Sequence, residues 1–289
     1  MNRETELGII RRTYAKQILA SVGVTDARIE AAFAAVPREA YLGPGPWYVF
    51  RGDKGYVQTP DADPAYLYDD VLVGIVPERR LNNGQPSYHA EMIAAAAPQP
   101  GEHLVHIGAG TGYYTAIMAE LVGRAGKVTA IEFDPELAGR AAAIFASSSN
   151  VRVIQGDGAK LTFDTADVIY VNAGATRPAD AWLDGLADGG RLILPLTKRP
   201  RLVPNDPLPL SRHGAVFRIE RKDNDYFAKW ISPVAVFPCE GGRDPKSEAA
   251  LADAFGKGGW QNVRRLYRSG DLPIERCWLQ APGWSLAYS

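Results

Sequence analysis

Residues 106–113, His-Ile-Gly-Ala-Gly-Thr-Gly-Tyr, join a short apolar run to a run with helical periodicity. The apolar run at residues 103–107 predicts a buried strand, and residues 112–122, which stop at Gly123, predict a helix. Glycines let the backbone of such a turn approach a ligand closely, and the helix that follows offers free N–H groups. The stretch therefore predicts a strand–loop–helix unit of the kind that binds nucleotides.

The same alternation continues on both sides of this loop. Helices are predicted at residues 86–97, 135–146 and 179–186, and strands at residues 127–132, 151–154, 167–172 and 191–196. A βαβαβ alternation indicates a parallel sheet with helices on both faces. We therefore predict an α/β fold with a doubly wound, mostly parallel sheet.

The flanking segments follow other patterns. Residues 4–36 have helical spacing in two runs, and residues 43–64, rich in glycine, proline and aromatics, predict an ordered loop that covers a neighbouring surface. After residue 196 the patterns predict a loop at 198–211, an antiparallel hairpin from strands 215–221 and 226–237, a helix at 246–255, and strand candidates at 262–267 and 276–279.

The sequence thus divides into three expected parts. Residues 1–80 form N-terminal helices and a cover segment on the substrate side, residues 81–240 form the core, and residues 241–289 form a C-terminal α+β extension.

Composition narrows the class of protein. The 289 residues are 46% hydrophobic and 22% charged, and a net charge of −1 leaves no electrostatic footprint for nucleic acid or an anionic membrane. No apolar run is long enough to span a bilayer, and the N-terminus lacks a signal peptide core. Cys239 and Cys277 make neither a disulfide framework nor a zinc cluster. We expect a cytoplasmic protein without a metal site.

Two acidic residues extend the glycine loop into a nucleoside site. Glu132 ends the next strand, twenty positions after Gly112, where a carboxylate can accept both ribose hydroxyls. Asp157, between Gly156 and Gly158 after the third strand, can accept a hydrogen bond from an adenine amino group. Each alone could be a surface carboxylate, a turn residue or a helix cap. Ligands bind at the carboxyl ends of such strands, so the three features together predict a nucleoside site.

Further motifs follow one another along the chain. They are Val-Pro-Arg-Glu at 36–39, Tyr-Asp-Asp at 68–70, Gly-Gln-Pro at 84–86, the glycine loop at 107–113, Gly-Asp-Gly at 156–158, Leu-Ala-Asp-Gly-Gly-Arg-Leu-Ile-Leu-Pro at 186–195 and Val-Phe-Pro at 236–238. Through these motifs the chain resembles, from about residue 36 to residue 237, the protein-L-isoaspartate O-methyltransferase family. The glycine loop and Gly-Gly-Arg-Leu recur in many methyltransferases, whereas the whole set in this order is far more specific.

The resemblance implies a cofactor, a fold and a set of site residues. The cofactor is S-adenosyl-L-methionine (SAM), with S-adenosyl-L-homocysteine (SAH) as product, and the fold is a seven-stranded sheet with an inverted, antiparallel final hairpin. The implied cofactor residues are Ile107, Gly108, Ala109, Gly110, Gly112, Tyr113, Glu132, Phe133, Asp157, Gly158 and Asn172. The implied residues on the acceptor side are Asn83, Gly84, His89 and Asp69.

One departure from the family pattern bears on the acceptor. The motif serine, to which the resemblance assigns the substrate carboxylate, is Gly84 here, and Asn82, Asn83 or Ser87 could supply a donor instead. The family's Thr-Ala-Ala after the fourth strand is Asn-Ala-Gly at residues 172–174.

The chemistry explains why no catalytic triad is visible. A carboxylate acceptor has a pKa near 4, so it is ionised at neutral pH and needs no general base. The protein must then align the reactants and exclude water. An amine or phenol acceptor would more often need a base, and His89 and Asp69 are the nearest candidates, although His89 could instead pack on the cofactor loop and Asp69 or Asp70 could cap a turn.

Three hypotheses remain open from the sequence. The first is SAM-dependent carboxyl methylation of isoaspartyl peptides or proteins, which the motif order favours. The second is a methyltransferase of the same fold that acts on a small molecule or a modified peptide. Gly84 favours it, and so do the two parts that exceed the usual family pattern, residues 43–64 and the stretch after Pro238. The third is a SAM-binding module without catalysis, which little supports. The loop's G-x-G-x-G spacing disfavours a nicotinamide dehydrogenase, whose pattern is G-x-G-x-x-G. The sequence does not indicate an oligomeric state.

Overall fold

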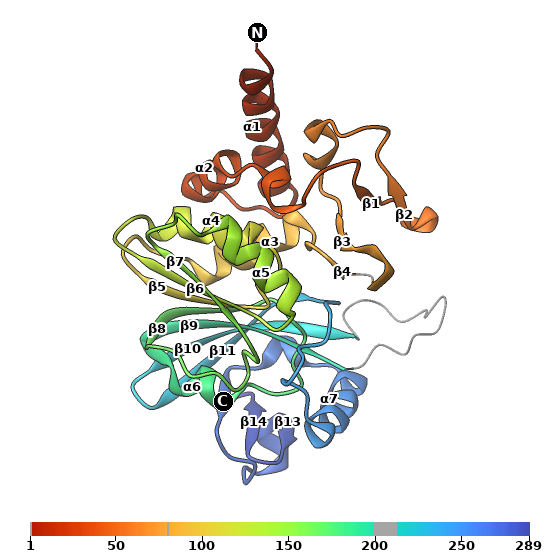
Figure 1. Ribbon diagram of the computed structural model, residues 1–289. Coiled ribbons are helices and arrows are strands. Elements are labelled where there is room, and N and C mark those ends of the chain that lie inside the picture. Colours follow the sequence, from red (N-terminus) through yellow and green to blue (C-terminus); the bar gives the residue numbers. More distant parts are fainter. Residues whose placement is uncertain (1, 80, 199–212) are drawn as a thin grey trace. The chain divides into compact units, whose positions relative to one another are not determined.

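The computed structural model describes residues 2–79, 81–198 and 213–289 (Figure 1). Its contacts divide the chain into two compact units. The first unit comprises the described residues of Met1–Gly101, Ala109–Ala130 and Asp134–Ile154, and the second comprises those of Glu102–Gly108, Ile131–Phe133 and Gln155–Ser289. The three-part division expected from the sequence stays a prediction.

Helices dominate the first unit. They are α1 (Arg3–Ser21), α2 (Ala27–Ala35), α3 (Pro86–Ala96), α4 (Tyr113–Val122) and α5 (Pro135–Ile144). Side-chain caps begin several of them: Asn2 accepts from the Thr5 N–H, and Asp134 accepts from the N–H groups of Glu136 and Leu137. These helices confirm the two N-terminal runs and the three helices predicted beside the glycine loop.

The aromatic segment of the first unit folds differently from the prediction. Residues 43–64 contain a hairpin of β1 (Tyr48–Phe50) and β2 (Tyr56–Gln58), so the expectation of a loop was wrong. Its core is a cluster of Leu42, Trp47, Val49, Leu67 and Val73. Each strand has three residues, too few for alternation to reveal it. A second small hairpin joins β3 (Gly74–Val76) and β4 (Leu81–Asn82).

A mixed sheet organises the second unit. Within the described residues its strand order is β13-β14-β12-β11-β10-β9-β8-β5-β6-β7, and β6 and β7 belong to this unit through their carboxyl ends. The strands are β5 (His103–Ile107), β6 (Lys127–Glu132), β7 (Val151–Gln155), β8 (Ala166–Val171), β9 (Leu186–Thr197), β10 (Gly214–Lys222), β11 (Asp225–Pro233), β12 (Arg265–Tyr267), β13 (Cys277–Ala281) and β14 (Trp284–Ala287). The helices are α6 (Asp180–Asp184) and α7 (Pro245–Lys257).

The α/β class is confirmed, and the sheet is larger than the expected seven strands. The β5–β8 and β8–β9 pairs are parallel, whereas β9, β10 and β11 pair antiparallel in chain order. The final three strands continue the sheet antiparallel from β11. β11 ends at Pro233, short of the predicted residue 237. The loop predicted at 198–211 lies outside the described residues apart from Lys198.

The C-terminal extension is part of the second unit's core. The indole of Trp284 is buried and donates to the Ser247 hydroxyl of α7 at 3.1 Å, and Phe255 packs against Trp260 and Trp278. The helix and two strand candidates predicted here are confirmed, and β14 was missed. The Pro282-Gly283 turn before it is the hairpin signal that could have revealed it. Among the described residues, no helix is long and apolar enough to cross a membrane.

Replacing Trp284 with alanine tests this packing. Removing a buried tryptophan leaves a cavity, so Trp284→Ala is expected to lower the free energy of unfolding by about 3–5 kcal/mol in urea denaturation. The control is Ile274→Ala in the same extension, whose side chain is 63% exposed and whose loss is expected to stay within about 0.5 kcal/mol. Equal effects of the two changes would contradict the assigned packing.

Candidate functional site

The glycine loop begins in the second unit, where β5 ends. Gly108, Gly110 and Gly112 all have positive φ angles, as the tight turn requires. The Gly108 N–H donates to the Ile131 carbonyl of β6 at 2.9 Å, and the Asn172 side-chain amide donates to the Gly108 carbonyl at 3.3 Å. The loop is therefore held between the ends of β6 and β8.

The two predicted carboxylates lie at neighbouring strand ends of the same unit. Glu132 is buried at the end of β6, and its carbonyl accepts from the Gly156 N–H at 2.9 Å. Asp157 follows β7, where its carboxylate accepts from the Ala159 N–H at 3.0 Å and pairs with Lys160 at 2.9 Å. Because parallel strands end at one edge of the sheet, the structure brings Ile107, Gly108, Glu132, Asp157, Gly158 and Asn172 to that edge. The side chain of Phe133, next to Glu132, is largely exposed.

Residues 109–113 continue the loop into the first unit. Tyr113 begins α4, and its ring is buried against Tyr14, Phe33 and Tyr41, with its hydroxyl 3.3 Å from that of Tyr14. Burial raises the pKa of Tyr113 well above its usual value. Its side chain is therefore a neutral group in the core of the first unit.

A buried arginine organises the acceptor side of the first unit. The guanidinium of Arg38 donates to the carbonyls of Leu67 at 2.7 Å, Asp69 at 3.2 Å and Val71 at 2.7 Å. It also donates to the Asn83 side-chain oxygen at 2.9 Å. Asn83 is 7% exposed, and its side-chain nitrogen has no hydrogen-bond partner among the described residues. One cation thus fixes residues 67–71 and presents the Asn83 amide. In the sequence Arg38 was recognised only as part of the Val-Pro-Arg-Glu motif, and its buried role was missed. The signal that could have revealed it is a single arginine that directly follows the apolar face of a helix.

Two adjacent aspartates have different environments. The Asp70 carboxylate accepts from the Ser87 N–H at 2.8 Å, the Ser87 hydroxyl at 2.6 Å and the Gln85 amide at 2.9 Å, so it holds the start of α3. The Asp69 carboxylate is largely exposed, accepts from the Asp70 N–H and lies 3.6 Å from Arg51. Of the two aspartates that could cap a turn, Asp70 is therefore the one that does so. The hydroxyl of Ser87, a suggested donor, already donates its hydrogen bond to Asp70.

Gly84 and His89 share one volume. Gly84 has a φ of 75°, and a β-carbon added there would overlap the Nε2 atom of His89. The buried imidazole stacks on Tyr114 with the ring centroids 3.5 Å apart, and the Tyr114 hydroxyl donates to the Gly84 carbonyl at 3.2 Å. The imidazole thus occupies the place that a side chain at position 84 would need. Asn82, the other suggested donor, accepts from the Gly84 N–H through its side-chain oxygen at 2.9 Å.

Comparison with known proteins identifies the family. The family model described as protein-L-isoaspartate(D-aspartate) O-methyltransferase matches residues 15–204, well over half of the chain. The chain belongs to this family. It is accordingly a SAM-dependent methyltransferase, and no group of three or more His, Cys, Asp or Glu residues in the described part of the chain could hold a metal ion.

Individual relatives agree with this assignment. The protein-L-isoaspartate O-methyltransferase of Ignicoccus hospitalis is 28% identical over 79% of this chain and 96% of its own. That of Methanoregula boonei is 32% identical over 76% of this chain and 92% of its own. A solved structure titled protein-L-isoaspartate O-methyltransferase is 27% identical with a TM-score of 0.62, over 78% of this chain and 65% of its own. A Plasmodium falciparum structure in complex with SAH, at 17% identity and a TM-score of 0.59 over 79% of this chain and 97% of its own, shares the fold.

The Arg38 network can be tested by a charge-conserving change. Lysine lacks the planar fork of donors, so Arg38→Lys leaves buried carbonyls of residues 67–71 unsatisfied and is expected to cost at least about 3 kcal/mol of unfolding free energy. Chemical denaturation measures the loss, and the exposed Arg12→Lys is the control, expected to stay within about 0.5 kcal/mol. A stability of Arg38→Lys equal to that of the control would refute the network.

Proposed function

We propose that this chain transfers the methyl group of SAM to the α-carboxylate of an isoaspartyl residue in a peptide or protein. The observation that carries the proposal is the family match, which spans the acceptor-side motifs from Arg38 to His89 as well as the glycine loop. The acceptor carboxylate oxygen bonds to the methyl carbon, the methyl–sulfur bond breaks, and the products are a methyl ester and SAH. Free thiols at Cys239 and Cys277 support a reducing, cytoplasmic setting.

The strand ends of the second unit would hold the nucleoside. Glu132 would accept hydrogen bonds from both ribose hydroxyls, and Asp157 would accept one from the adenine amino group. Ile107, Phe133 and Gly158, at or beside the same strand ends, would line the base, and Asn172 holds the loop through its hydrogen bond to Gly108. Ala109, Gly110, Gly112 and the backbone of Tyr113 carry the loop onward. The buried, strand-end position of Glu132 supports this assignment, because a carboxylate shielded from water makes strong charge-assisted hydrogen bonds. When bound, SAM supplies an activated methyl group.

The first unit would hold the acceptor. The Asn83 nitrogen is a buried donor that still lacks a partner among the described residues, and Arg38 fixes the orientation of its amide. Asn83 would therefore donate to the acceptor carboxylate beside Gly84, with His89 lining the same place. Asp69, exposed and turned toward Arg51, is the weakest of the four acceptor-side candidates. A carboxylate needs no base, so these residues have to position the acceptor and exclude water.

Substitution of Glu132 tests the cofactor assignment. Glu132→Ala removes two charge-assisted hydrogen bonds and is expected to weaken SAH binding by roughly 100-fold or more, measured by calorimetry. Glu136→Ala, an exposed glutamate in the next helix, is the matched control and is expected to bind SAH normally. Unchanged affinity in Glu132→Ala would remove the ribose assignment.

A matched pair of peptides tests the acceptor. With methyl-labelled SAM, an isoaspartyl peptide is expected to gain base-labile label, whereas its aspartyl twin gains less than about a hundredth as much, since a misplaced acceptor loses the benefit of alignment. SAH binding by calorimetry is measured in parallel. Intact SAH binding without any labelling would sink the isoaspartyl proposal while leaving the cofactor site in place.

A second candidate is a methyltransferase of the same fold with another acceptor, and the Gly84–His89 arrangement favours it. An imidazole stands where the family has a serine, so it could serve an acceptor that must lose a proton. If the wild-type enzyme leaves the isoaspartyl peptide unlabelled, the double variant Gly84→Ser, His89→Ala provides both the hydroxyl and the space for it. If the double variant labels the isoaspartyl peptide, the missing serine is the cause of the wild-type enzyme's inactivity on it. If the double variant leaves the peptide unlabelled, the missing serine is excluded as the cause.

A further inference from the structure

A turn beyond the family match approaches the nucleoside residues of the second unit. Residues 237–244 follow β11 and hydrogen-bond to residues 174–176, which follow β8. The Gly174 N–H donates to the Phe237 carbonyl at 2.6 Å, the Cys239 N–H to the Gly174 carbonyl at 3.0 Å, and the Thr176 N–H to the Gly242 carbonyl at 3.2 Å. We call residues 238–243 the brace turn. These backbone bonds fix its position against the end of β8.

Arg243 anchors the brace turn with its side chain. Its guanidinium donates to the Gly174 carbonyl at 3.0 Å and to the Thr197 carbonyl at 3.2 Å, and it forms an ion pair with Glu248 of α7 at 3.1 Å. The side chain is 14% exposed. A planar fork held at several acceptors has one orientation, so the turn is rigidly attached to β9 and α7.

Gly241 in this turn lies directly against the Asp157 carboxylate. Its φ is 76°, and a β-carbon added there would overlap both carboxylate oxygens of Asp157. The neighbouring Cys239 senses the same charge: burial first, and then the negative charge of Asp157, raise the pKa of its thiol to about 12. The Asp157 carboxylate thus has two partners on its own turn, the Ala159 N–H and the Lys160 ammonium, and Gly241 leaves it space on a further side.

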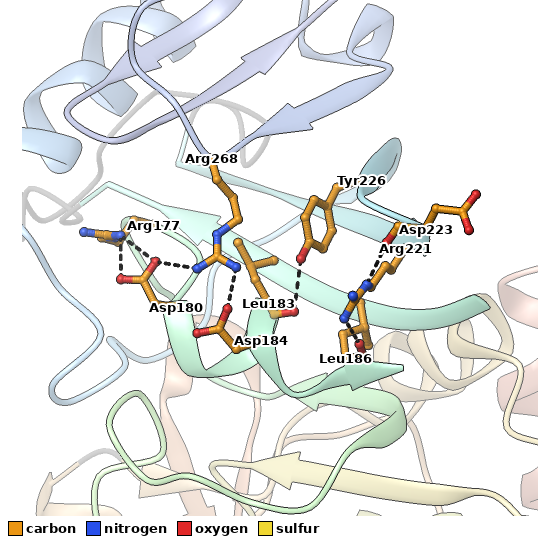
Figure 2. A network of polar contacts seen from close by, with 9 residues as sticks. All are labelled: Arg177, Asp180, Leu183, Asp184, Leu186, Arg221, Asp223, Tyr226 and Arg268. Atoms are coloured by element: carbon orange, nitrogen blue, oxygen red, sulfur yellow. Dashed lines mark hydrogen bonds and ion pairs between the residues drawn. The ribbon is translucent and has the colours of Figure 1, made fainter. Parts of the chain in front are cut away.

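The residue after Asp157 is held from another side of the same unit. The buried Trp182 of α6 donates from its indole to the Gly158 carbonyl at 2.7 Å. Figure 2 shows how α6 is tied to later parts of the chain: Arg268 pairs with Asp180 and Asp184, and the Tyr226 hydroxyl donates to the Leu183 carbonyl. The Asp157-Gly158 turn is therefore contacted by two later parts of the chain, Gly241 at Asp157 and Trp182 at Gly158.

We propose that Gly241 is a positioning residue for adenine recognition, and that the brace turn sets the orientation in which Asp157 accepts the hydrogen bond of the adenine amino group. This inference rests on the SAM site of the proposed function. Any side chain at position 241 would displace the carboxylate. The displaced carboxylate would no longer be oriented to accept the hydrogen bond of the amino group. The ribose contact of Glu132 and the glycine loop would be unchanged.

The test compares two ligands that differ at one edge of the base. SAH carries the adenine amino group beside an unprotonated N1, and S-inosyl-L-homocysteine carries an oxo group beside a protonated N1. Wild-type protein is expected to prefer SAH by at least about tenfold in calorimetry, as for a hydrogen bond to a charged group. In Gly241→Ala the preference is expected to fall below about threefold. The control is Gly283→Ala, which has a similar φ of 78° but open space around an added β-carbon, and it is expected to keep the wild-type preference.

The ratio separates positioning from loss of structure. A Gly241→Ala variant that weakens both ligands equally, or that keeps the full preference, overturns the inference. If that variant does not fold, Arg243→Lys loosens the same turn and is expected to reduce the preference partially; an undiminished preference overturns the inference there too. A wild-type protein that binds both ligands equally also overturns it, while SAH binding and peptide labelling still decide the proposed function separately.

Discussion

The buried guanidinium of Arg38 is the interaction on which the acceptor side of the first unit depends. A charge removed from water is costly unless hydrogen bonds replace its hydration, and here one backbone segment and one amide do so. Leu67 ends a 3-10 helix at Pro64–Leu67, and residues 68–71 after it belong to no helix or strand. The carbonyls of Leu67, Asp69 and Val71 converge on the planar guanidinium, which donates a hydrogen bond to each of them. The side-chain oxygen of Asn83 accepts from the same group. The cost of burying the charge thus becomes a means of specifying one arrangement of loops.

The parts of the fold that sequence predicted are those that regular periodicity and strand topology determine. β5 and β6 begin and end at the predicted residues, because each is a compact apolar run with polar or glycine residues at its borders. Glu132 and Asp157 were predicted at strand ends since a parallel sheet places such ends at one edge. The short hairpin at residues 48–58 and β14 were missed because three or four residues carry too little alternation. The sequence could not predict that Asp70, and not Asp69, caps α3. The two side chains are adjacent and chemically identical, and only the backbone of the turn decides where each points.

Position 84 shows how one missing side chain changes what its neighbours can do. The absence of a β-carbon at Gly84 admits the His89 imidazole, and stacking on Tyr114 keeps the ring there. A serine offers one neutral hydroxyl, whereas an imidazole can donate, accept or carry a proton near neutral pH. In our proposal a carboxylate acceptor would accept a hydrogen bond from the neighbouring Asn83 amide. In the second candidate function an acceptor that must lose a proton would use His89. The two proposals therefore differ in which of these neighbours the acceptor would contact.

The C-terminal extension gains its importance from where the sheet continues. Because β12, β14 and β13 are added beyond β11, the chain must leave β11, form the brace turn and α7, and return to the sheet. The segment that leaves β11 places Gly241 against the Asp157 carboxylate. The segment that returns to the sheet places Arg268 against α6, and Trp182 of α6 donates to the Gly158 carbonyl. Two distant pieces of chain thus lie against two consecutive residues of the turn after β7. A rigid support lowers the entropy that a turn loses when it binds a ligand, and this is the physical basis of the role that we propose for the brace turn.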